Sequence, residues 1–305
     1  MIPDEKPERA ERSAQRAPSL WKLSGMTWTD FIRRIWCQLQ QDRILDQSAK
    51  LSFYFLLSTF PLLIFLITLL GLLLQSSPEF QVTLQEYLAA VLPTSASGLI
   101  DKTLGEITTG SGGGQLSLAL LFTLWTASRG VVAIMEGLNI ACGVEDSRPW
   151  WKKNLVALGL TFVLLILVAA ALFAMIYGSH YSATIGNQIG ASTLMAWVWQ
   201  VLTWIIPLAF VLLAFNLLYL YAPNVKRRRW HWLMPGTVAG VMLWLGVSFG
   251  FKLYLNYFDS YTVTYGSIGT VIILLMWFYF SAIAFLLGGE VNSELEKTSG
   301  QSEQP

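Results

Sequence analysis

The sequence predicts an all-α, polytopic membrane protein: a bundle of six transmembrane helices with amphipathic helices beside it. Hydrophobic residues make up 54% of the chain and charged residues 13%, about half the charged share of soluble domains. The apolar residues fall into six runs, each long enough to cross a bilayer as a helix that rises about 1.5 Å per residue. None alternates with period two, as barrel strands do. The runs cover 51–74, 116–142, 155–178, 194–221, 233–258 and 267–289.

The distribution of basic residues predicts how these runs cross the membrane. Seventeen of the 20 Lys and Arg residues lie before the first run, in the second and fourth loops, or after the last run. Only Lys102 lies in the loops on the opposite side. Because basic loops stay in the cytoplasm, we expect a multi-pass protein with both termini cytoplasmic.

The segments outside the membrane domain, 50–292, are polar. Residues 1–26 and 293–305 lack apolar periodicity, which predicts disordered cytoplasmic tails. Residues 27–49 place Phe31 to Leu39 in an amphipathic pattern. This helix is expected either to lie on the inner membrane surface or to pack on the protein's own cytoplasmic loops. The loop at 75–115 has apolar residues at helical spacing, which predicts short amphipathic periplasmic helices.

Three polar residues interrupt the second run. At 100° per residue, Glu136 falls about 20° and Asn139 about 80° from Arg129, so the three share one stripe. An arginine in hydrocarbon is costly without a partner or water, so Arg129 is expected to face the bundle interior or a hydrated cavity. Two roles stay open: polar contacts that hold helices together, or a docking site for an anionic substrate or ion.

Other spans carry weaker signals. Pro61 and Pro207 interrupt the first and fourth runs and predict helix kinks. Asn216, Glu290 and Asn292 lie at cytoplasmic ends, where they form either a polar cluster or ordinary helix-end polarity.

The fifth run contains two pairs of glycines four residues apart. Small residues at this spacing allow helices to approach closely, so both pairs predict packing. The pairs are Gly236 with Gly240 and Gly246 with Gly250.

Enzyme motifs are absent from the sequence. It has no nucleotide-binding loop, dinucleotide fingerprint or CxxC pair. His180 and His231 fall on opposite sides of the predicted membrane and cannot share a metal. Net charge is +1, which indicates no nucleic-acid partner. We therefore expect no catalytic residues, no metal and no cofactor. The expected partners are the lipid bilayer, a lipid or anionic small molecule, and an envelope protein.

Several segments resemble the YihY/BrkB family of bacterial inner-membrane proteins. They are Phe60-Pro61, Ser128-Arg129-Gly130, Pro223-Asn224 and Tyr265-Gly266-Ser267, and the resemblance runs from about Asp46 to Asn292. It implies a six-span protein of the bacterial cytoplasmic membrane whose activity is unsettled. Family members have carried the label "ribonuclease BN", which this chain does not support because it lacks the histidines and acidic ligands of a metallo-nuclease.

Function is predicted at the level of a class. The leading hypothesis is envelope transport of a lipid-like or anionic substrate through an intramembrane cavity lined by Arg129. The alternative is a membrane scaffold or partner subunit that transports nothing.

Overall fold

The computed structural model describes residues 28–73, 113–189, 192–225, 234–257 and 260–298, and these are helical with no strand among them. This confirms the all-α prediction. The tail at 1–26 and the helices expected within 75–112 lie outside the described residues. The elements are α2 (Trp28–Gln41), α3 (Ile44–Leu73), α6 (Gly113–Ala141), α7 (Trp150–Ile189), α8 (Ser192–Tyr221), α9 (Pro235–Tyr257) and α10 (Ser260–Thr298).

Four segments of the described helices are long and apolar enough to cross a membrane. They correspond to the last four predicted runs and cover Trp150–Ala174, Trp204–Tyr221, Pro235–Leu255 and Val271–Lys297. The first two runs lie in α3 and α6, which have 30 and 29 residues. That these two helices also cross the bilayer stays a prediction.

Some helices extend beyond the apolar runs. α10 continues to Thr298, so the prediction of a disordered tail is wrong for residues 293–298. Ser293, Glu294 and Leu295 are buried, because tertiary packing covers residues whose polar composition alone indicates solvent. At the other end, Arg43 adopts a φ of 47° and separates α2 from α3 within the segment predicted as one helix.

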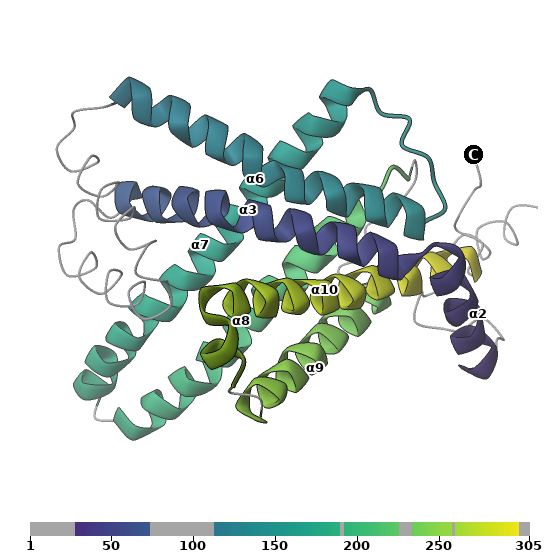
Figure 1. Cartoon of the computed structure of the whole chain (residues 1–305). Coiled ribbons are helices and arrows are strands. Elements are labelled where there is room, and N and C mark those ends of the chain that lie inside the picture. Colours follow the sequence, from purple (N-terminus) through teal and green to yellow (C-terminus); the bar gives the residue numbers. More distant parts are fainter. Residues whose placement is uncertain (1–27, 74–112, 190–191, 226–233, 258–259, 299–305) are drawn as a thin grey trace, which may run out of the picture.

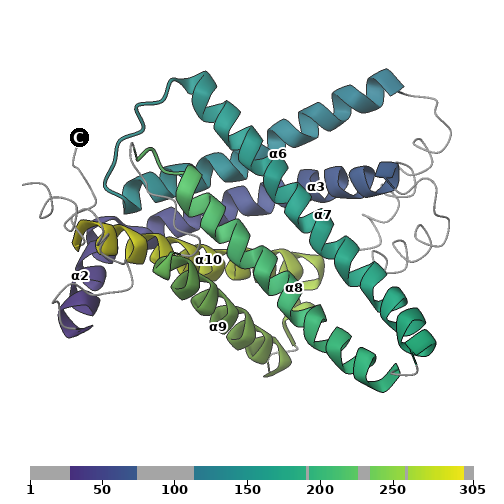
Figure 2. The same cartoon turned by 180° about the vertical axis from the view of Figure 1, so that it is seen from behind.

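The helices form two sets that cross one another (Figures 1 and 2). α3, α6 and α10 run side by side, and α7, α8 and α9 lean across them. The most extensive contacts join α9 to α10, α3 to α6, α7 to α8, and α3 to α10. α10 therefore links the two sets through its contacts with α9 and α3.

The core lies where α3, α6, α8 and α10 meet, and its largest members are almost completely buried. The Tyr219 hydroxyl donates to the Phe285 carbonyl at 2.6 Å and ties α8 to α10. By contrast, many large apolar side chains on the outer surface are exposed, as expected for helices that face acyl chains. Large core members that are almost completely buried include Ile44, Leu51, Met135, Leu138, Tyr219 and Leu286.

The amphipathic helix α2 packs on the protein itself, against the end of α10 (Figure 1). Phe31 is buried, and Leu39 packs against the core. Arg34 forms an ion pair of 3.3 Å with Glu294. Trp36, on the outer side, remains 62% exposed. Whether the exposed face of this helix also lies on the inner membrane surface stays a prediction.

Candidate functional site

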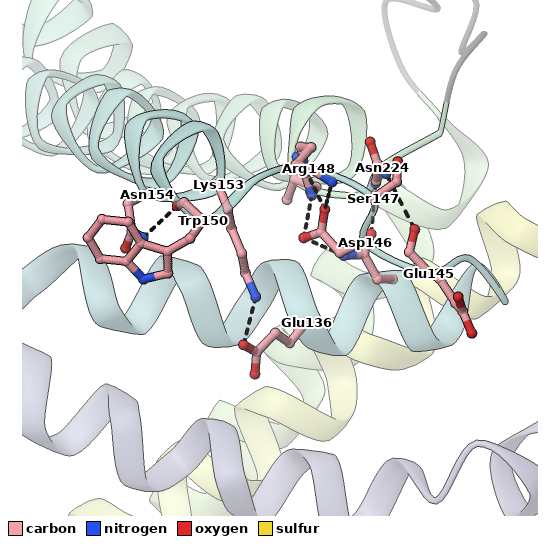
Figure 3. Close-up of polar contacts among 11 residues, drawn as sticks. Glu136, Glu145, Asp146, Ser147, Arg148, Trp150, Lys153, Asn154 and Asn224 are labelled. Carbon is pink, nitrogen blue, oxygen red and sulfur yellow. Dashed lines mark hydrogen bonds and ion pairs between the residues drawn. The ribbon is translucent and has the colours of Figure 1, made fainter.

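Arg129 lies on α6 and contacts the start of α7. Its Nη1 donates to Asn154 Oδ1 at 3.2 Å, and its guanidinium lies 4.8 Å from the centre of the Trp125 ring. Asn154 Nδ2 in turn donates to the Trp150 carbonyl at 2.7 Å, which fixes the amide with its oxygen toward Arg129 (Figure 3). Within the described ranges, no carboxylate forms an ion pair with Arg129.

Glu136 lies about two turns further along α6 and is held by two lysines. Lys153 of α7 donates to Oε1 at 2.8 Å (Figure 3). Lys50 of α3 donates to Oε2. The Glu136 side chain keeps 34% of its surface exposed. Because Lys153 and Asn154 are adjacent, the surroundings of Arg129 and Glu136 are continuous. We call Arg129, Glu136, Lys50 and Lys153 the basic patch; its net charge is +2.

Asn139 belongs to a different arrangement, at the end of α6. Its Oδ1 accepts the backbone N–H of Asn224 at 2.7 Å, and its Nδ2 donates to Asp146 Oδ2 at 3.2 Å. Arg148 donates to Asp146 at 2.8 Å and to the Ala222 carbonyl at 2.9 Å. These residues join the α6–α7 loop to the end of α8 (Figure 3). We call Asn139, Asp146, Arg148 and Asn224 the loop clasp.

The Asp146 carboxyl of the loop clasp has a shifted pKa. Burial acts to raise this pKa, but the hydrogen bonds and charge of Arg148 outweigh burial, so the pKa lies below its usual value. Asp146 therefore stays ionised and keeps its pair with Arg148 at neutral pH.

The three residues of the predicted stripe thus face α7 and the loop before it, but they have separate partners. Arg129 contacts an amide, Glu136 contacts two lysines, and Asn139 pins a loop. Sequence reasoning identified Asn139 but missed Lys50, Lys153 and Asn154, and it missed that Asn139 joins Asp146, Arg148 and Asn224 in the loop clasp. One signal was present: the connection between α6 and α7 is short, and short connections bring the start of the second helix back to the first.

The predicted cytoplasmic cluster of Asn216, Glu290 and Asn292 divides into two parts. Asn216 Oδ1 accepts from the Met234 N–H and the Thr237 hydroxyl. Asn292 Oδ1 accepts the Gly236 N–H at 2.7 Å. Both asparagines therefore accept hydrogen bonds from groups at the start of α9. Backbone N–H groups in the first turn of a helix have no acceptor within that helix. Glu290 does not join them.

The two predicted helix kinks and the absence of a metal site remain to be compared with the structure. Pro61 lies inside α3 and Pro207 inside α8, and both helices continue through their proline; the predicted kinks stay predictions. In the part of the chain that the structure describes, no three His, Cys, Asp or Glu side chains are grouped so that they could hold a metal.

The family model described as virulence factor BrkB matches residues 35–305. The chain belongs to the BrkB family. A relative named "Putative ribonuclease-like protein YfkH", from Bacillus subtilis (strain 168), is 36% identical over 83% of this chain and 90% of its own. The UPF0761 membrane protein of Aeromonas salmonicida (strain A449) is 27% identical over 90% of both chains. That of Aliivibrio fischeri (strain ATCC 700601 / ES114) is 29% identical over 85% of this chain and 81% of its own. No solved structure matches this member of the BrkB family.

Proposed function

We propose that this chain transports an anionic, lipid-like molecule in the bacterial inner membrane, and that the anionic group docks on the basic patch. The observation that carries the proposal is that Arg129 has no acidic partner among the described residues. Its polar partner is the neutral Asn154 amide, while the nearest acid on the same stripe, Glu136, already has two lysines. The guanidinium therefore keeps its positive charge available to an anion.

The net charge of the patch favours a phosphate or carboxylate group. Arginine binds such groups through two parallel N–H donors, and a hydrogen bond to a charged group contributes about 1.5–3 kcal/mol. Lys50 and Lys153 add two ammonium groups on neighbouring helices. Since Glu136 holds both lysines in place, they can share their donors with an incoming anion without a large rearrangement.

The surface next to Arg129 favours a substrate with an apolar tail. Phe122 lies seven residues before Arg129, about 20° away around the helix, so the two share a face of α6. Phe122 is 67% exposed and Trp125, between them, is 43% exposed. A lipid-like molecule can therefore place its head on the basic patch and its tail along this face.

The proposed docking place is this face of α6. Two apolar grooves in the described part of the structure lie between α9 and α10 and between α3 and α10, and Arg129 lines neither of these two. A substrate on the α6 face would enter from the bilayer, which suits a lipid better than a water-soluble ion.

The test uses the full-length protein reconstituted in vesicles that contain phosphatidylglycerol. Arg129→Gln removes one charge from the patch and keeps a polar side chain of similar shape. Lys252→Gln is the matched control, because Lys252 is an exposed cation of α9 away from the patch. We expect Arg129→Gln to weaken retention of phosphatidylglycerol, measured by native mass spectrometry, by roughly tenfold or more, since 1.4 kcal/mol corresponds to a factor of ten.

The same vesicles report movement of the lipid between leaflets. A transporter should move labelled phosphatidylglycerol faster than empty vesicles do, and Arg129→Gln should slow this movement while Lys252→Gln does not. Retention and movement that are equal in both variants would contradict the proposal. A partner protein that copurifies in stoichiometric amount, with no lipid movement, would favour the scaffold alternative.

A further inference from the structure

Glu290 of α10 is the most unusual acidic residue of the described structure. Its side chain is completely buried, and neither carboxylate oxygen has a hydrogen-bond partner. Buried charges in proteins are normally paired, hydrogen-bonded or bound to an ion. No Lys or Arg of the described segments forms an ion pair with Glu290, so within these segments the carboxylate has no paired cation.

The charged groups around Glu290 increase its need for a bound cation. Asp42, which follows α2, lies within hydrogen-bonding reach of the Glu290 carboxyl group, so the two could share a proton; Asp42 and Glu294 of α10 also act on Glu290 as like charges, and Lys297 of α10 is the opposing cation. Lys297 is exposed, and the nearby Arg34 is engaged with Glu294 at 3.3 Å. In addition, α2 ends at Gln41, so the partial negative charge of its C-terminus lies beside Asp42.

Two uncharged oxygens complete the surroundings. A Cβ on Gly137 of α6 would contact both Leu51 of α3 and Leu286 of α10, so these two leucines lie at the same level. One helical turn nearer the cytoplasm, α10 carries Glu290 and α3 carries Gln47 and Ser48. The Gln47 Oε1 and Ser48 Oγ atoms are also buried without a hydrogen-bond partner, and Ser48 is completely buried.

We propose that Glu290 and Asp42, with Gln47 and Ser48, form a binding site for one small monovalent cation, either Na⁺ or a proton, at the junction of α2, α3 and α10. Buried acidic residues in membrane proteins commonly mark ion and proton pathways. Two carboxyl groups with amide and hydroxyl oxygens suit a hard cation, whereas zinc and similar metals prefer nitrogen and sulfur ligands. The site is independent of the anion-docking proposal.

The position of the site gives it access to the cytoplasmic side. The end of α10, the start of α3 and α2 lie together at one end of the molecule (Figures 1 and 2). α2 covers this junction, since it contacts both α10 and α3. A cation would therefore enter beside α2 and bridge α2, α3 and α10.

The experiment measures cation binding by the full-length protein in nanodiscs. Thermal midpoints are compared in NaCl and in choline chloride at equal ionic strength, at neutral pH. A ligand that binds only the folded protein raises the thermal midpoint. Once the ligand concentration exceeds Kd, this rise grows with the logarithm of the concentration. A Na⁺ site predicts a saturable rise in NaCl that is lost in Glu290→Gln and Asp42→Asn. The control Asp46→Asn, which alters an exposed carboxyl in the first turn of α3, should keep it.

Infrared spectroscopy on the same samples tests whether the bound cation is a proton. If the cation is a proton, NaCl has no specific effect, and the wild-type protein shows a carboxylic acid band that disappears on alkaline titration and is missing in Glu290→Gln. The absence of both signals in the wild-type protein would overturn the proposal. The proposal would also be overturned if either signal persisted in Glu290→Gln. If Glu290→Gln does not fold, persistence of the signal in Asp42→Asn has the same consequence.

Discussion

Replacing Gly288 with alanine should separate α9 from α10, because the two helices touch at their glycines. A Cβ added at Gly288 would lie 2.7 Å from the Gly236 carbonyl oxygen and 2.9 Å from the Gly240 Cα, and it would also collide with the Tyr219 hydroxyl. Two of these three atoms are backbone and cannot turn aside. The methyl group therefore forces one helix to move.

The expected loss of stability follows from three contributions. Overpacking a close contact costs about 1–3 kcal/mol. Displacing Tyr219 breaks its 2.6 Å hydrogen bond to the Phe285 carbonyl, which costs about 0.5–1.5 kcal/mol. Alanine improves helix propensity by up to about 1 kcal/mol. The net destabilisation is about 0.5–3.5 kcal/mol, which corresponds to a decrease of roughly 1–5 °C in the thermal midpoint.

The assay is thermal unfolding of the purified protein in one detergent, at a fixed scan rate because unfolding of such proteins is often irreversible. Gly246→Ala is the matched control: Gly246 is also on α9, but nothing lies within 4 Å of a Cβ added there. We expect its midpoint to be unchanged or slightly raised. A Gly288→Ala protein as stable as the wild type, or two variants that lose stability equally, would refute the reasoning.

Two further predictions concern the cap of α9 and the loop clasp. Asn292→Ala removes the acceptor of the Gly236 N–H and should cost about 1 kcal/mol; hydrogen exchange of the Gly236 amide should accelerate, and unchanged exchange would show that the cap is unimportant. The lowered pKa of Asp146 means that its contribution to stability is present above its ordinary pKa of about 3.9 and is lost as pH falls through the lower, folded value. The thermal midpoints of wild type and Asp146→Asn should therefore differ at pH 6 and converge toward pH 3, whereas a constant difference would contradict this assignment.

Hydropathy was sufficient to predict the helical class and the last four spans, because the bilayer requires long apolar segments whatever their neighbours. It was insufficient for helix ends and for packing. The two glycine pairs of α9 look identical in sequence, yet Gly236 and Gly240 contact α10 while Gly246 and Gly250 have open space. Which side of α9 meets α10 depends on the position of a partner distant in sequence.

The polar residues of the site illustrate the same limit. Residue type and helical phase placed Glu136 and Asn139 on one stripe with Arg129, but they left open whether the protein or a ligand provides the partners of these residues. Their partners are Lys50, 86 residues away, and Asn224, 85 residues away. Periodicity describes a single helix and contains no information on such distant contacts.

The distribution of charges also bears on whether the buried polar groups merely hold the bundle together. Polar contacts that serve only cohesion should pair opposite charges, because an unpaired charge in a membrane domain is costly. The described structure instead leaves Arg129 with a neutral partner and leaves Glu290 without an ion pair or a hydrogen-bond donor. Lys50 of α3 pairs with Glu136, while Gln47 and Ser48, close before it on α3, have buried oxygens without hydrogen-bond partners. One positive group and one negative group thus remain without an ion pair in the described segments, an arrangement that suits two ligands of opposite charge better than it suits cohesion.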